Sequence, residues 1–260
     1  MSNPAPQATI LTVPATSSTV VSIDSLRSHC STCSMRSLCL PVGLTEPDLA
    51  QLDAVLGKRL KLRKGEPLFR HGAPFSSLYA VRVGSLKTTV LADDGREQVA
   101  GYHMPGDLLG LDGMSEDRHG CAATALEDAE LCVIPFARIE QLARDVPALQ
   151  HNLHKFLARE IERDHQLMLL LGSMRAEERL AVFLLNLSER YRCRGYSSTE
   201  FVLRMTREEI GSYLGLKLET VSRLFSRFQQ EGLVIVAGRS VKLVDLPMLK
   251  QLVGHRREPD

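Results

Sequence analysis

The stretch RMTREEIGSYLGLKLETVSRLFSRFQQEGL, residues 204–233, contains two short helical patterns joined by a tight turn. Thr206 is placed to cap the first helix, and Glu209 completes a capping box three residues later. Gly215 permits the turn, and a second helix is expected to begin near Leu218. That helix has an apolar side, with Leu218, Val221, Leu224, Phe225 and Phe228, and a polar side, with Glu219, Ser222, Arg223, Ser226 and Gln230. The pattern predicts a helix-turn-helix with one packed face and one free face.

The free face carries side chains that are suited to reading DNA bases. Arginine can bond O6 and N7 of guanine together, glutamate can accept from the cytosine amine, and serine is adaptable. A plain solvated face is the alternative, but the capped first helix and the turn favour DNA. Downstream, Val234 to Val236 and Val241 to Val244 flank Gly238 and Arg239, which is typical of a β-hairpin. We therefore predict a winged helix-turn-helix that binds double-stranded DNA.

The composition is that of a globular protein with uneven charge. The chain has 260 residues, 44% of them hydrophobic, which is enough for two domains. From Arg175 onward there are 15 Lys or Arg and 11 Asp or Glu, whereas the preceding part has 17 and 20. The positive excess therefore coincides with the predicted DNA-binding module. Met1 to Ser28 does not have the pattern of a signal peptide, and no run of about 18 apolar residues occurs. We expect a cytoplasmic protein without membrane contact.

The part of the chain before residue 146 has the periodicity of short strands. Strand-like stretches are Ser77 to Val83, Ser85 to Leu91, Glu97 to His103 and Glu130 to Ile134, separated by glycines and turns. They predict an antiparallel sandwich or barrel, and with the helical remainder an α+β protein. A short helix is expected at Glu46 to Leu56. Pro147 can open a long helix that continues to about Leu171.

The long helix carries a stripe with alternating spacings of four and three residues. The stripe consists of Leu157, Ile161, Asp164, Met168 and Leu171. This spacing is typical of a two-stranded coiled coil and predicts a homodimer, although packing against the chain's own β-domain is an alternative. In a symmetric dimer the two Asp164 carboxylates approach each other, with a repulsion on the order of a few kcal/mol. We therefore expect a marginal dimer that needs a second input.

Three cysteines near the N-terminus are spaced closely enough to bind one inorganic centre. Cys30, Cys33 and Cys39 form the pattern C-x2-C-x5-C, and Cys121 or Cys132 of the β-domain could supply a fourth ligand. Cys193 lies beyond the long helix, near the predicted DNA-binding module. Thiolate sets of this kind bind zinc or iron-sulfur clusters, and the spacing does not separate the two. His29 is another possible ligand, and unconnected buried cysteines are the alternative to any inorganic centre.

Six stretches in this order resemble the CRP/FNR family of bacterial regulators, and within it the FNR (fumarate and nitrate reduction regulator) branch. They are HCSTCSMRSLCLP (29–41), SLYAVRVGSLK (77–87), GYHMPGDLLGLD (101–112), LCVIPF (131–136), AEERLAVFLLNLSER (176–190) and MTREEIGSYLGLKLETVSRLFSRFQ (205–229). The resemblance implies a jelly-roll-like β-roll sensor domain, a dimerisation helix and a winged helix-turn-helix. The expected divisions are a flexible leader (1–28), the cluster-binding loop with the β-roll (29–145), the dimerisation helix (146–173), the DNA-binding domain (174–250) and a tail (251–260).

The resemblance also implies roles for individual residues. Cys30, Cys33, Cys39 and Cys132 correspond to the ligands of an oxygen-labile four-iron four-sulfur cluster. Glu219, Ser222 and Arg223 correspond to residues that read each half of an inverted repeat resembling TTGAT-N4-ATCAA. Related proteins have an aspartate at the position of Asp164 that opposes dimerisation until the cluster is intact. The turn at Asp93, Asp94 and Gly95 resembles a loop that contacts RNA polymerase, with a plain hairpin tip as the alternative.

The resemblance departs from the cyclic-nucleotide branch at the phosphate-binding segment. That branch has an Arg-Ser or Arg-Thr pair, whereas this chain has His119 and Gly120 there, so cAMP binding is not expected. Cys121 and Cys193 fall outside the cluster set and are expected to be buried or partly buried thiols. The sequence thus predicts an oxygen-responsive DNA-binding regulator and no enzyme. The alternative is a CRP-like regulator that senses another small ligand or redox state, with a structural metal or free thiols.

Overall fold

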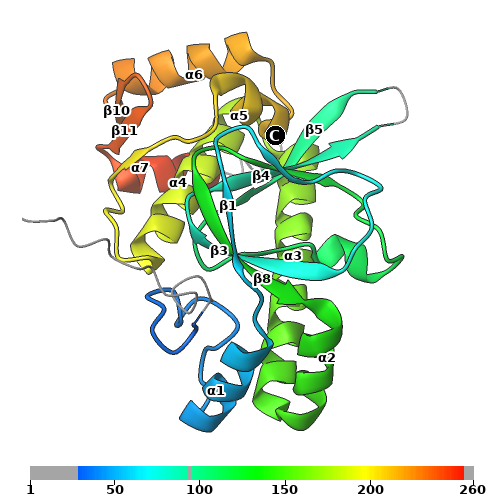
Figure 1. The fold of residues 1–260 in the computed structure, drawn as a ribbon. Coiled ribbons are helices and arrows are strands. Elements are labelled where there is room, and N and C mark those ends of the chain that lie inside the picture. The colour runs from blue at the N-terminus through cyan, green and yellow to red at the C-terminus, as the bar shows by residue number, and fades with distance from the viewer. Residues whose placement is uncertain (1–28, 93–94, 255–260) are drawn as a thin grey trace, which may run out of the picture.

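The computed structural model describes residues 29–92 and 95–254 (Figure 1). The predicted leader (1–28), the turn residues Asp93 and Asp94, and residues 255–260 of the predicted tail lie outside this described part. Two sheets form the N-terminal domain, and helices with a third, three-stranded sheet form the C-terminal part. The predicted α+β class is confirmed.

The N-terminal domain is a β-roll of two four-stranded antiparallel sheets, ordered β1-β8-β3-β6 and β2-β7-β4-β5. The strands are β1 (Arg59–Leu62), β2 (Pro67–Phe69), β3 (Ser77–Val83), β4 (Leu86–Leu91), β5 (Glu97–His103), β6 (Leu108–Leu109), β7 (Ala122–Ala125) and β8 (Ala129–Pro135). Leu86 and Leu131 are fully buried between the sheets, and Leu78 is fully buried between β3 and the helices outside the roll. The four strands predicted from periodicity are confirmed to within one residue at each end.

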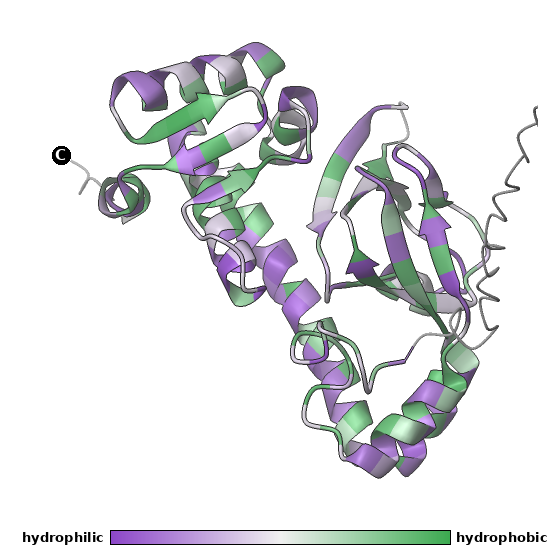
Figure 2. Cartoon of the chain, turned by 60° about the vertical axis from the view of Figure 1, so that its left-hand side comes forward, coloured by the Kyte–Doolittle hydropathy of each residue, from purple (hydrophilic) through white to green (hydrophobic). Residues whose placement is uncertain are grey.

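Helices border the roll at one end and along one side. They are α1 (Glu46–Val55), α2 (Phe136–Asp145) and α3 (Pro147–Ser173), and a 3-10 turn, η2 (Leu111–Met114), follows β6. Pro147 occupies the first turn of α3, where its missing N–H is not needed. Figure 2 shows this 27-residue helix running from α2 along the β-roll to the C-terminal module. The long helix predicted from Pro147 is confirmed.

The C-terminal module is a winged helix-turn-helix. It contains α4 (Ala176–Cys193), β9 (Glu200–Val202), α5 (Arg207–Leu214), α6 (Leu218–Gln230), β10 (Val234–Ala237), β11 (Ser240–Leu243) and α7 (Leu246–Gly254). The predicted capping box forms, because Thr206 Oγ1 accepts from the Glu209 N–H (3.1 Å) and the Glu209 carboxylate accepts from the Thr206 N–H (2.7 Å). Gly215 ends α5 with φ of +63°, a conformation that glycine adopts readily. Strands β10 and β11 form the wing around Gly238.

One detail of the predicted packing is wrong. Leu218, assigned to the packed face of α6, is 43% exposed, whereas Val221, Leu224, Phe225 and Phe228 are buried. Leu218 is the first residue of α6, whereas the other four belong to the apolar cluster of the module. The buried stripe therefore begins one turn later.

The β-roll and the DNA-binding module share one apolar cluster. Val99, Tyr102, Met104 and Leu126 of the roll belong to the same cluster as the buried side chains of α4, α5 and α6. In Figure 1, α5 accordingly lies beside β5. The sensor-like domain therefore contacts the module directly as well as through α3. Among the described residues, none of the helices combines the length and the apolar character that crossing a bilayer requires.

Candidate functional site

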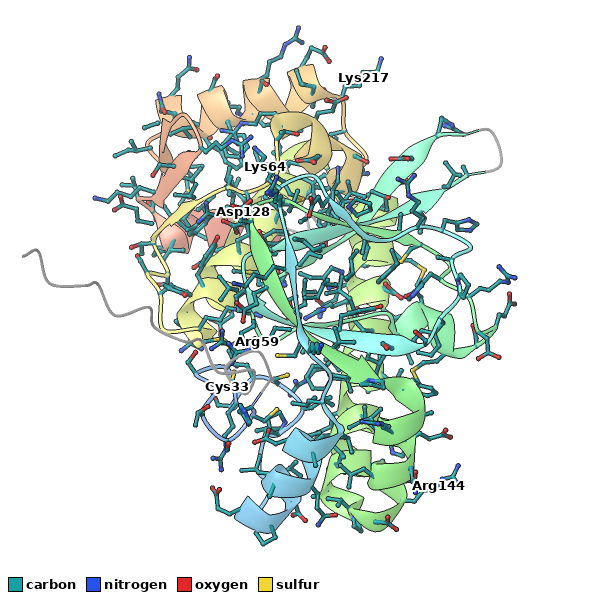
Figure 3. All side chains as sticks on the ribbon, viewed as in Figure 1. Cys33, Arg59, Lys64, Asp128, Arg144 and Lys217 are labelled. Atoms are coloured by element: carbon teal, nitrogen blue, oxygen red, sulfur yellow. The ribbon has the colours of Figure 1, made fainter. Side chains whose placement is uncertain are left out.

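Four of the six cysteines line the same cavity. The cavity lies between the N-terminal loop and β3 and β8, and its cysteines are Cys30, Cys33, Cys39 and Cys132. Cys33, labelled in Figure 3, lies on the loop beside the start of β1. Cys132 lies on β8, where it pairs with Arg59 of β1 and Ala80 of β3. The β-sheet register therefore brings a thiol 93 positions after Cys39 to the loop that carries the other three.

The loop is a series of tight turns that other elements hold in place. Backbone hydrogen bonds run from the Cys33 N–H to the Cys30 carbonyl and from the Val42 N–H to the Cys39 carbonyl, each 3.2 Å long. Asp53 of α1 accepts from the Cys30 N–H and from the Ser31 hydroxyl.

At its C-terminal end the same loop is bound to the long helix. The buried amide of Asn152, on α3, donates to the carbonyls of Leu40 and Val42, each at 2.8 Å. The conformation of the cysteine loop is thus tied to both α1 and α3. Asn152 was not identified from the sequence, because a lone asparagine in a helix gives no periodic signal.

The surroundings of Cys30 and Cys39 disfavour the charged thiolate form when no cation is bound. Burial raises the pKa of Cys39 to about 12, and burial together with the neighbouring thiols and Asp53 raises that of Cys30 as well. The remaining wall is largely apolar, with Leu40, Leu52 and Ile134 among the lining residues. Four thiols in an apolar pocket are the donor set that iron-sulfur clusters use. The residues present therefore fit such a group.

The other two cysteines lie elsewhere. Cys121 is partly buried, and its thiol is 3.3 Å from the Asp112 carboxylate. Cys193 is exposed at the end of α4 beside Glu189, so the expectation that it is at least partly buried is wrong. Its position at the last turn of α4 faces solvent, whereas the core side of that helix is formed by residues such as Leu187.

The polar side of α6 is free, as the sequence predicts. Glu219 and Arg223 are exposed and Ser222 is half-buried. Behind them Arg207 lies over the ring of Phe225, with 3.5 Å between its guanidinium carbon and the ring centroid. Lys217, at the N-terminus of α6, extends outward in Figure 3. Helix α6 thus presents charged and hydroxyl side chains on an outer face of the molecule.

The stripe on α3 is only partly covered within the chain. Ile161 and Met168 are 57% and 61% exposed, Asp164 is exposed, and Leu157 and Leu171 are half-buried. Large exposed apolar side chains in a row on one helix mark a surface that a partner covers. This exposure argues against packing on the chain's own β-roll and favours the predicted seam between two copies.

The segment that corresponds to the phosphate-binding part of cyclic-nucleotide domains has His119 where that branch has an arginine. His119 is buried and stacks on Phe69 with 3.7 Å between ring centroids. The neighbouring Arg118 is exposed and donates to the Gly72 carbonyl at 2.8 Å.

Comparison with known proteins places these parts in one family. A model described as the Crp-like helix-turn-helix domain matches residues 178–252, and one described as the cyclic nucleotide-binding domain matches residues 59–145. The chain is 47% identical over 232 residues to the transcriptional activator protein anr of Pseudomonas aeruginosa, covering 89% of this chain and 95% of that protein. The chain belongs to the CRP/FNR family.

Further similarities agree with this CRP/FNR membership. The fumarate and nitrate reduction regulatory protein of Escherichia coli strain K12 is 42% identical over 229 residues, covering 88% of this chain and 92% of that protein. The solved structure of FixK2 from Bradyrhizobium japonicum is 33% identical, with a TM-score of 0.70 over 76% of this chain and 97% of that one. The protein is a transcription regulator with a DNA-binding helix-turn-helix, not an enzyme.

Proposed function

We propose that this regulator responds to oxygen through a four-iron four-sulfur cluster held by Cys30, Cys33, Cys39 and Cys132. The observation that carries the proposal is that these four thiols line one cavity, while Cys121 lies on another part of the β-roll and Cys193 at the end of α4. When bound, such a cluster supplies a centre that reacts with molecular oxygen. The names of the anr and fumarate and nitrate reduction relatives, an activator and a regulator of reductive metabolism, support the same assignment.

The arrangement of the thiols favours a cluster over a single structural zinc ion. A zinc ion needs its ligands about 2.0 to 2.3 Å from one point. In the part of the chain that the structure describes, no three His, Cys, Asp or Glu side chains converge closely enough to hold one ion. A cluster takes one thiolate at each of four iron corners and so suits thiols spread around a cavity wall.

The contacts of the loop indicate how its state reaches the dimer seam. Asn152 holds the carbonyls of Leu40 and Val42 from the buried side of α3, five residues before Leu157 at the start of the seam. A change in the loop therefore acts on the same helix whose outer side carries Ile161, Asp164, Met168 and Leu171. We propose that the dimer forms along this stripe and that the two Asp164 carboxylates keep it marginal.

In the dimer, two α6 helices about one DNA turn apart would read an inverted repeat. We propose that Glu219, Ser222 and Arg223 contact each half of a site resembling TTGAT-N4-ATCAA. Their exposure on the outer face of α6 supports this assignment. Activation would further involve RNA polymerase through the turn at residues 93–95, two of which lie outside the described residues.

The test is to purify the full chain under nitrogen and measure iron, visible absorbance and binding to a duplex containing the repeat. We expect about four iron atoms per chain, a brown colour and tight binding, all of which decline together in air. Cys132→Ser should lose iron and operator binding, whereas the matched control Cys121→Ser should keep both. Iron-free wild-type protein, or iron retained in Cys132→Ser, would refute the proposal.

A second candidate is a regulator that senses a small ligand by a route independent of iron. It is favoured by a cavity of about 360 Å³ between β4 and β5 of the roll and helices α3 and α4. The buried ring of His103 lines this cavity, and its Nδ1 has no hydrogen-bond partner among the described residues. A regulator of this kind would bind the operator in air once its ligand was added, with or without iron.

A further inference from the structure

A buried carboxylate joins the β-roll to the long helix α3 and to α4 of the DNA-binding module. Asp107 lies in the turn between β5 and β6 and is 6% exposed. Its carboxylate accepts hydrogen bonds from Arg163 of α3 (3.3 Å), from Arg190 of α4, and from Arg194, the C-cap residue that follows α4 (2.9 Å). It also accepts from the Met104 N–H of its own turn (2.8 Å). One side chain therefore connects three elements.

Arg194 is held by this turn through more than its charge. Its Nε donates to the Pro105 carbonyl at 2.7 Å, and its Nη1 donates to the Arg190 carbonyl at 2.8 Å. Its side chain is only 6% exposed. The guanidinium therefore clamps the C-terminal end of α4 against the turn at residues 105–107. Because Leu180, Leu184 and Leu187 of α4 lie in the core of the DNA-binding module, the orientation of α4 is the orientation of that module.

The same turn touches the cysteine cavity on its other side. The Gly106 N–H donates to the Val81 carbonyl (2.8 Å), and the Val81 N–H donates to the Asp107 carbonyl (3.0 Å). Val81 lines the cavity of the four cysteines. Leu38, on the cysteine loop, packs against Gly106 so closely that a Cβ there would lie 2.9 Å from the Leu38 Cβ. Gly106 also has φ of +94°, so glycine is required twice over.

We propose that Asp107 is a positioning residue that transmits the state of the cysteine loop to the orientation of the DNA-binding module. This inference rests on the proposed function, since it concerns how the same cysteine site controls DNA binding. A displacement of Leu38 or Val81 moves the Gly106–Asp107 turn, and the three arginines carry that movement to α3 and α4.

The charges around Asp107 make the packing of α4 on the β-roll depend on this carboxylate. Removing the carboxylate leaves the three arginines without their shared anion, and Glu160 still pairs with Arg163. Buried like charges repel and seek new partners or solvent. We therefore expect a change in how α4 packs on the roll. Because neither the cysteine ligands nor the exposed α3 stripe belongs to this cluster, iron binding and dimer formation should not change.

The test uses Asp107→Asn in the full chain, purified under nitrogen, because asparagine preserves the shape of the side chain and removes its charge. We expect iron content and the dimer fraction in sedimentation to match the wild type, while binding to a duplex containing TTGAT-N4-ATCAA weakens at least tenfold. Arg194→Lys keeps the charge but loses the forked contacts. It should also keep its iron and its dimers, and its binding to the duplex should weaken less than that of Asp107→Asn. Glu140→Gln is the matched control, because Glu140 pairs with Arg144 on the exposed side of α2 (Figure 3).

Two results would overturn the inference. One is wild-type operator affinity in Asp107→Asn. The other is a loss of iron, dimers or folding in parallel with DNA binding in both variants, which would assign Asp107 a purely structural role. Failure of the proposed function is distinguishable from either, because it appears in the wild type as missing iron or as operator binding that air does not change.

Discussion

His103 predicts a loss of stability in mild acid that can be calculated from the structure. The residue ends β5 inside the cavity between the β-roll and the helices, and its side chain is buried. Its Nε2 lies 3.2 Å from Thr88 Oγ1, and its Nδ1 has no partner within the described chain. Burial lowers the pKa of His103 to about 4, with Arg163 and Arg190 lowering it further and Asp107 opposing them. The folded protein therefore holds this ring neutral at physiological pH.

Whether acid stabilises or destabilises the fold depends on which state, folded or unfolded, binds the proton more tightly. In the unfolded chain the pKa of a histidine is about 6.5, so between pH 6.5 and 4 the unfolded state binds more protons than the folded state. Stability therefore falls as the pH falls through this window. A shift from 6.5 to about 4 corresponds to about 3 kcal/mol in total, at about 1.4 kcal/mol per pKa unit. About 2 kcal/mol of this should be lost between pH 7.5 and pH 5.

The assay is urea unfolding of the cluster-free, reduced protein at pH 7.5, 6.5 and 5, followed by circular dichroism. His103→Gln is the matched variant, because glutamine can still bond Thr88 but does not titrate. The wild type should lose about 2 kcal/mol more than the variant between pH 7.5 and 5. Equal losses in the two proteins would show that the ring takes up its proton without unfolding, and the reasoning from burial would be wrong.

Three further predictions concern the ligands, the seam and the recognition helix. Cys132→Ser should abolish iron binding while Cys121→Ser retains it, as measured by iron analysis under nitrogen. Asp164→Ala should shift the monomer-dimer balance toward dimers in air by removing a repulsion on the order of a few kcal/mol, and an unchanged sedimentation profile would contradict the seam. Arg223→Ala should reduce discrimination at one base pair of each half-site by about 1 to 3 kcal/mol in competition binding, whereas Ser226→Ala serves as a control on the same helix.

The helix-turn-helix could be predicted in detail because its signals are local. The capping box of Thr206 and Glu209 and the left-handed turn at Gly215 depend on contacts within a few residues of one another. Leu218 was misassigned because periodicity fixes the side of a helix but not how far along it the neighbouring helices reach. Strand bounds in the roll were similarly readable from alternation within each strand.

Contacts between distant segments could not be read in the same way. Spacing left Cys121 and Cys132 equally plausible as the fourth thiol, since the choice depends on the pairing of β8 with β1 and β3. Only the resemblance to the FNR branch selected Cys132. Asp107 gave no signal at all, because Gly106-Asp107 resembles any tight turn and its arginine partners follow 56 to 87 residues later.

A dimeric DNA-binding protein must pair its two chains and orient their recognition helices. The cysteine loop is connected to one helix for each of these proposed tasks. Asn152 connects the loop to α3, whose outer side bears Ile161 and Met168 of the proposed seam. Val81 and the turn at Asp107 connect the cavity to α4, whose inner side belongs to the DNA-binding core. Pairing two chains without orienting their recognition helices would leave the half-sites out of register, because both helices must enter the major groove about one turn apart. A single loop that contacts α3 directly and reaches α4 through the turn at Asp107 would meet the two requirements together.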